Sequence, residues 1–145
     1  MKDKILERLN CQINKSEVVE VVEVEVGYDI RKLDFELSRK NSKNFIFELY
    51  NNHIFNEERF FKFIGSIAEF IDNYSELQHL PEDKYCSYIN EIIKNCEDIL
   101  WAFTRHYMTD DDYFIENFSQ IKDDLTQYYM YIREYSERLI LNIQE

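Results

Sequence analysis

The last quarter of the chain carries its strongest periodic signal. Between residues 110 and 144 no glycine or proline occurs, and apolar or aromatic residues recur in alternating steps of four and three. This spacing is typical of a heptad seam on one face of a helix. A helix over 110–144 would be about 50 Å long, so we expect the rest of the chain to pack along it. The positions are Phe114, Phe118, Ile121, Leu125, Tyr128, Ile132, Tyr135 and Leu139.

Two earlier segments, residues 56–80 and 82–108, show the same helical period. Asn56 is a favourable N-cap for the first, and Pro81 suits the start of the second. Thr109 and Asp112 have capping-box spacing, which predicts the start of the last helix. Three consecutive helices with short connections are expected to pack antiparallel. Residues 2–13 also have one apolar face, which predicts a short N-terminal helix.

Between the predicted helices 2–13 and 56–80, apolar residues recur with a period of two. Residues 18–28 are rich in valine and end in strict alternation, and residues 32–38 and 45–50 alternate again. Polar residues 39–44 separate the last two segments at hairpin length. The pattern predicts a three-stranded antiparallel β-meander with one apolar face. The alternative is that residues 30–50 are helical.

These elements together predict an α+β fold. An N-terminal helix and a three-stranded antiparallel β-meander (residues 1–52) would pack on an antiparallel bundle of three long helices (residues 53–145). With only two glycines and one proline among 145 residues, long regular elements are expected. A bare three-stranded sheet needs a partner layer, so we expect residues 1–145 to form a single domain.

The charge is strongly acidic, with 29 acidic against 17 basic residues and a net charge of −12. Residues 1–52 carry ten acids and nine bases, residues 53–109 ten and five, and residues 110–145 nine and three. Such a surface repels phosphate and disfavours direct nucleic-acid binding. It attracts a basic protein surface and accelerates encounter with it. The alternative is that the acidity only maintains solubility.

Cysteine usage favours a reducing, cytoplasmic setting. The three cysteines, Cys11, Cys86 and Cys96, are odd in number and form no C-x-x-C motif. The N-terminus is charged and lacks the apolar region of a signal peptide. No apolar run approaches the length of a membrane span, so we expect no membrane partner.

Signals for catalysis are poor. Glycine-rich phosphate loops and nucleophile elbows need more glycine than this chain has. The histidines, His53, His79 and His106, belong to no recognisable catalytic motif. Glu76 and His79 have the Glu-x-x-His spacing of carboxylate-bundle metal sites, but such bundles use it twice. We therefore expect no catalytic residues, no cofactor and no metal, with a weak site near Glu76 and His79 left open.

The surface of the last helix is the best candidate for partner binding. Tyr131 lies beside acidic residues, and tyrosine is enriched at interface hot spots; the alternative is that Tyr131 packs against the meander. We expect a small acidic inhibitor that occludes a basic, nucleic-acid-binding partner such as a nuclease. An immunity protein or a phage anti-defence protein works in this way, and the residue usage suits an AT-rich bacterial or phage gene. The alternative is a homo-oligomeric structural module that pairs through the long C-terminal helix. The predicted contact residues are Asp110, Asp111, Asp112, Asp123, Asp124, Tyr131 and Glu134.

Overall fold

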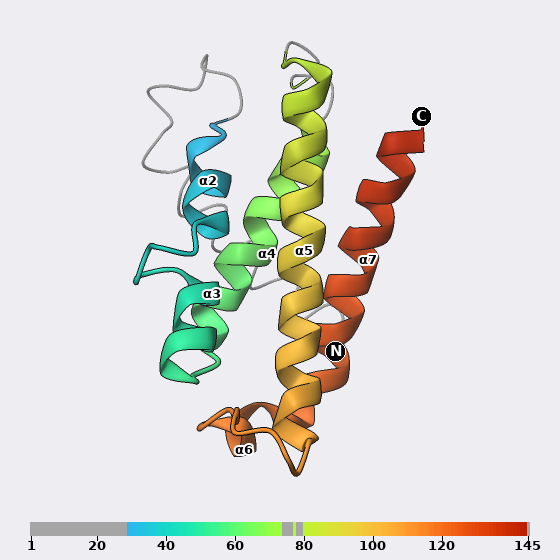
Figure 1. The fold of residues 1–145 in the computed structure, drawn as a ribbon. Helices are drawn as coiled ribbons and strands as arrows, with labels where there is room; N and C mark the ends of the chain where they lie inside the picture. Colours follow the sequence, from blue (N-terminus) through green and yellow to red (C-terminus); the bar gives the residue numbers. More distant parts are fainter. Residues whose placement is uncertain (1–28, 74–76, 78–79, 145) are drawn as a thin grey trace.

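The computed structural model describes residues 29–73, 77 and 80–144. Three helices dominate it: α4 (Glu57–Asp72), α5 (Glu82–Tyr107) and α7 (Leu125–Gln144). They run up, down and up, as predicted (Figure 1). The side chain of Asn56 accepts a hydrogen bond from the Arg59 amide, which confirms the predicted N-cap of α4.

The core lies where α7 packs against both α4 and α5. At its centre four rings meet, with the Phe55 centroid 4.9 Å from Tyr128 and 5.0 Å from Phe45. The ring of Phe60 lies 5.0 Å from Tyr128. Residues from 33 to 139 contribute to this one cluster, so the segment before α4 shares the core of the three helices.

The predicted β-meander is wrong in the part of the chain that the structure describes, where no strand occurs. Residues Arg31–Leu37 form helix α2, Phe45–Phe47 the short helix α3, and Glu48–Asn52 the π-helical turn η2. The predicted helix 2–13 and strand 18–28 lie outside the described residues. The alternative of a helical 30–50 segment is therefore much closer to the structure.

Burial shows why alternation misled the prediction for residues 32–38. In a strand with this alternation Phe35 would face the core and Glu36 the solvent, but Phe35 is 37% exposed and Glu36 is only 4% exposed. Leu33 is buried and Leu37 partly buried, and a spacing of four fits one helix face as well as one strand face. In the next segment, the Asn44 side chain accepts from the Phe47 amide and caps α3.

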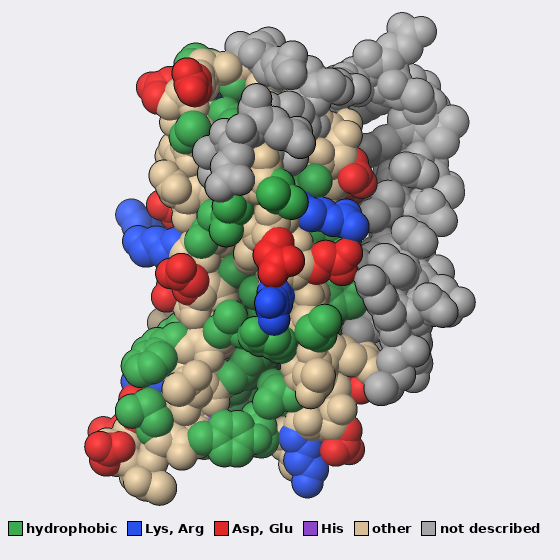
Figure 2. Space-filling model, turned by 90° about the vertical axis from the view of Figure 1, so that its right-hand side faces the viewer, with side chains coloured by type: hydrophobic (Ala, Val, Ile, Leu, Met, Phe, Trp, Pro, Cys, Tyr) green, Lys and Arg blue, Asp and Glu red, His purple; other side chains and the backbone are tan. Residues whose placement is uncertain are grey.

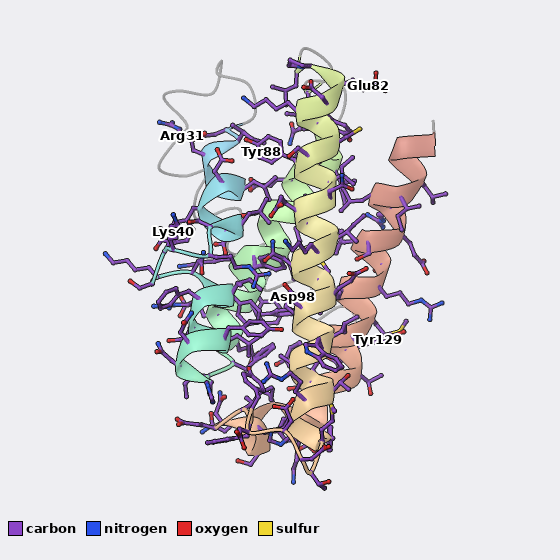
Figure 3. The ribbon with its side chains drawn as sticks, viewed as in Figure 1. Arg31, Lys40, Glu82, Tyr88, Asp98 and Tyr129 are labelled. Carbon is purple, nitrogen blue, oxygen red and sulfur yellow. The ribbon has the colours of Figure 1, made fainter. Side chains whose placement is uncertain are left out.

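The helices before α4 are tied to α5 by polar contacts on both sides of its midpoint. Arg39 forms an ion pair with Asp98, which lies beyond the middle of α5 (labelled in Figure 3), and the Tyr50 hydroxyl donates to the Asp98 carbonyl oxygen. Nearer the start of α5, the Tyr88 hydroxyl donates to the Asp34 carboxylate at 2.8 Å. These contacts hold α2 and η2 against α5, while α7 lies on the other side (Figure 1).

The prediction of one helix over residues 110–144 is also wrong, because α7 begins only at Leu125. α5 ends at Tyr107, residues 108–117 are irregular, and the short α6 (Phe118–Ile121) and 3-10 turn η4 (Lys122–Asp124) precede α7. α7 is thus 20 residues long. The heptad positions Ile121, Tyr128, Ile132, Tyr135 and Leu139 are buried, so the seam holds as a core face from α6 onward.

Candidate partner-binding end of the bundle

Residues 108–124, hereafter the 108–124 segment, close the end of the molecule where α5 stops and α7 starts (Figure 1). The segment is anchored first by Arg105, in the last turn of α5. Its Nε donates to Asp111 Oδ2 and its Nη2 to Asp111 Oδ1, both at 2.9 Å. Asp111 Oδ1 also accepts from the Tyr113 amide at 2.8 Å, and the guanidinium lies 4.7 Å from the Tyr113 ring centre.

This arrangement uses Asp111 as a structural group. The side-chain hydrogen bond from Arg105, followed by that of the Tyr113 amide, lowers the pKa of the Asp111 carboxyl. A bidentate guanidinium–carboxylate pair has a defined geometry. Asp111 therefore turns the chain away from the axis of α5 and does not begin a helix with its neighbours.

His106 provides the second anchor. Its Nδ1 accepts a hydrogen bond from the Ile115 amide at 3.0 Å, so the neutral ring carries its proton on Nε2. The same ring stacks on Phe118, with centroids 3.9 Å apart. His106 thus connects the end of α5 to the start of α6.

The third anchor joins the 108–124 segment to the connection between η2 and α4. Asn117 Oδ1 accepts from the Phe55 amide at 2.9 Å, and Asn117 Nδ2 donates to the Phe55 carbonyl oxygen at 2.7 Å. The Glu116 amide donates to the His53 carbonyl oxygen at 2.7 Å. His53 itself has φ = 60°, and its ring packs 4.8 Å from that of Tyr113. The irregular backbone is therefore held on two sides.

The predicted contact residues fall into two groups. In the first, within the 108–124 segment, Asp110, Asp112 and Asp123 are exposed, Asp124 is half-buried, and Asp111 is bound to Arg105. The remaining two lie farther along α7. These groups do not form one surface, because the long helix that was expected to carry them is broken.

Tyr131 and Glu134 make up the second group. Tyr131 is only 5% exposed and stacks on Tyr135 with centroids 6.0 Å apart. Burial raises the pKa of the Tyr131 hydroxyl. Glu134 accepts a hydrogen bond from Arg138 at 2.9 Å. Tyr131 therefore belongs to the core, and Glu134 is engaged within its own helix.

Sequence reasoning missed the apolar part of this end. Phe114 was assigned to the heptad seam but is 50% exposed, and Tyr107 and Met108 are exposed as well. Glu116, also missed, is exposed. The available signal was the run Asp-Asp-Asp-Tyr-Phe-Ile-Glu, in which acids flank aromatic residues at the place where the helix was assumed to continue. Aromatic and acidic side chains thus share one end of the bundle.

No group of three or more His, Cys, Asp or Glu side chains is arranged to hold a metal ion among the residues that the structure describes. Glu76 and His79 lie outside those residues.

Comparison of the chain with protein-family models, with curated proteins and with solved structures finds no match in any of the three. Within the described ranges, none of the helices combines the length and the apolar character needed to cross a membrane.

Proposed function

We propose that this chain is a small acidic binding protein that occludes a basic surface of another protein through the 108–124 segment. The proposal rests on one observation. Five carboxylates of the 108–124 segment form no ion pair or hydrogen bond within the described part of the chain. The segment has six acidic residues against one basic residue, Lys122. The five are Asp110, Asp112, Glu116, Asp123 and Asp124.

Unpaired carboxylates are suited to this role because binding breaks no internal contact. A lysine or arginine of the partner can approach them without displacing an existing ion pair. The anchors of the segment, through Asp111, His106 and Asn117, reduce the ordering cost that a mobile loop would incur on association. Exposed Tyr107 and Phe114 add the aromatic contact area that is enriched in interfaces.

The partner class that fits best is a protein whose basic surface normally binds nucleic acid, such as a nuclease. Carboxylates held in fixed positions would occupy the places of phosphates on such a surface. An immunity protein or a phage anti-defence protein of this kind would act by occlusion. The setting would be cytoplasmic, which is supported by the free thiols of Cys86 and Cys96.

The test compares two sets of substitutions in which carboxylates are replaced by amides of nearly the same shape. In the first, Asp110→Asn, Asp112→Asn and Glu116→Gln remove three charges from the 108–124 segment. In the matched control, Glu82→Gln, Asp83→Asn and Glu91→Gln remove three exposed charges from the other half of α5. Each immobilised protein is used to capture a partner from the native host, and the affinity is measured at low and high salt.

We expect the first set to weaken binding about tenfold, because three exposed pairs contribute about 0.5 kcal/mol each. The control set should retain most of the affinity, and salt should weaken the unmodified complex steeply. The bound partner should lose its affinity for nucleic acid. Equal loss in both sets, or affinity that does not change with salt, would show that the 108–124 segment is not the contact.

A homo-oligomeric module is the second candidate, and it rests on exposed Ile140 and Leu141 of α7. Two copies would each bring a net charge of −12, which opposes association. Sedimentation at micromolar concentration distinguishes the two candidates. A stable dimer that dissociates on replacement of both residues by glutamate would favour the module.

A further inference from the structure

A shallow groove runs between α5 and the beginning of α7. It has a volume of about 330 Å³ and is lined mostly by apolar side chains. Figure 2 shows apolar side chains gathered over the lower half of this face, with charged groups around them. The lining comes from both helices: Leu100, Phe103 and Thr104 on α5, and Leu125, Thr126 and Tyr129 on α7.

Large side chains are exposed on the two helices that line the groove. Trp101 is 48% exposed and follows Leu100 directly. Tyr129 and Met130 are exposed on α7, and Tyr129 lies in the lower half of that helix (Figure 3). Contiguous apolar surface of this kind, surrounded by polar groups, marks interaction sites on soluble proteins.

Most of the charges near the groove are acidic, with Lys122 and Arg133 as the exceptions, and they determine what the groove can accept. Glu97 is exposed one turn before Trp101, and Asp123 and Asp124 directly precede Leu125. Arg133, one turn beyond Tyr129, is paired with Glu137 at 3.0 Å. A basic occupant is therefore favoured, whereas a second copy of this acidic chain is opposed by charge.

The groove is also continuous with the 108–124 segment. The part of its lining on α7 begins at Leu125, which is the residue after that segment. On α5, Thr104 of the lining lies one turn before the end of the helix. A single partner can thus contact both surfaces. The aromatic rings add specificity, because a guanidinium over a tryptophan or tyrosine face is attracted by the ring electrons.

We propose that the groove docks an arginine-bearing segment of the partner, with a large aliphatic side chain between α5 and α7 and a guanidinium against Trp101 or Tyr129. This proposal rests on the proposed function and identifies the chemistry of the partner's contact. The acidic segment attracts the partner over distance, and the groove selects for apolar residues next to arginine.

The probe is a fluorescein-labelled peptide of alternating arginine and leucine. Two comparison peptides carry glutamate in place of arginine, or serine in place of leucine. Binding is followed by fluorescence anisotropy. It is also followed by the emission of Trp101, which is the only tryptophan in the chain and is the neighbour in sequence of Leu100 in the groove lining.

We expect the arginine–leucine peptide to bind saturably and to change the Trp101 emission, and both comparison peptides to bind at least about tenfold more weakly. Tyr129→Ala should weaken binding about five- to tenfold. Phe35→Ala, which removes an exposed ring from α2, should leave binding unchanged. Circular dichroism checks that each variant keeps its helix content.

Three results would overturn the groove proposal. One is an unchanged Trp101 emission at saturating peptide, and another is equal binding of the serine peptide. The third is a dimer in sedimentation that Trp101→Glu dissociates, since a second copy would then occupy the groove. If partner capture still depends on Asp110, Asp112 and Glu116 in any of these cases, the proposed function stands and the groove assignment alone fails.

Discussion

The buried carboxyl of Glu36 leads to a quantitative prediction of how the stability of the protein depends on pH. Its carboxyl lies 4% exposed on α2, which packs against α4, and its Oε2 has no hydrogen-bond partner within the described residues. Burial raises the pKa of Glu36 from 4.5 to about 7, while the positive charges of Lys62 and Arg59 act in the opposite direction. A carboxylate in this position is costly because it gives up hydration without gaining a hydrogen bond.

Proton linkage gives the direction in which stability changes with pH. The folded state binds this proton more tightly than the unfolded state, whose glutamate pKa is 4.5. The contribution of Glu36 to the free energy of unfolding is therefore fully present below that value and is lost as pH rises through about 7. At about 1.4 kcal/mol per pKa unit, the loss between about pH 5 and about pH 8 amounts to about 2.5 kcal/mol.

The assay is urea denaturation of the unmodified protein and of Glu36→Gln across that pH range. Glutamine has nearly the same shape and does not ionise, so the variant should lose this pH dependence and be the more stable protein at about pH 8. Glu91→Gln, which removes an exposed carboxyl from α5, is the matched control and should follow the unmodified protein. If Glu36→Gln keeps the same slope of stability against pH, Glu36 does not carry the effect and the reasoning is refuted.

Two further predictions concern single side chains. Asn117→Ala leaves both backbone groups of Phe55 without their partner and should lower the free energy of unfolding by about 2 kcal/mol, measured by urea denaturation; Asn52→Ala, at an exposed position, should cost less than about 0.5 kcal/mol. Burial raises the pKa of the Cys96 thiol to about 12, so an alkylating reagent at about pH 8 should modify Cys86 in the native protein and Cys96 only after unfolding, as read by peptide mass mapping. Equal modification of both native thiols would contradict the packing around Cys96.

The helices α4 and α5 were predictable because many positions on each face repeat the same helical period. An error at one position changes little over 16 or 26 residues. Residues 32–38 offered too few positions for that, since Leu33 and Leu37 fit a strand and a helix equally. Only the packing of α2 on α4, which buries Glu36 and leaves Phe35 exposed, distinguishes the two.

The assignment of Tyr131 shows a related limit. The residue is three positions after Tyr128 and four before Tyr135, so it can share a helix face with both. Its acidic neighbours in the sequence suggested a surface position, but the stacking of Tyr131 on Tyr135 extends the core. The exposed aspartates were easier to predict, because a run of carboxylates has few buried alternatives.

The break at residues 108–117 could not be read from hydrophobic period, because its cause is polar. A continuous helix would satisfy the backbone N–H and C=O groups of residues 108–117 by itself, so the irregular segment must replace those hydrogen bonds with others. The Tyr113 amide donates to the Asp111 carboxylate, the Ile115 amide to His106 Nδ1 and the Glu116 amide to the His53 carbonyl oxygen. As a consequence of the break, the acidic residues and the exposed rings of Tyr107 and Phe114 lie together at one end of the bundle. A search for function should therefore begin at the interruption of the predicted helix, and the uninterrupted seam of α7 is best understood as core.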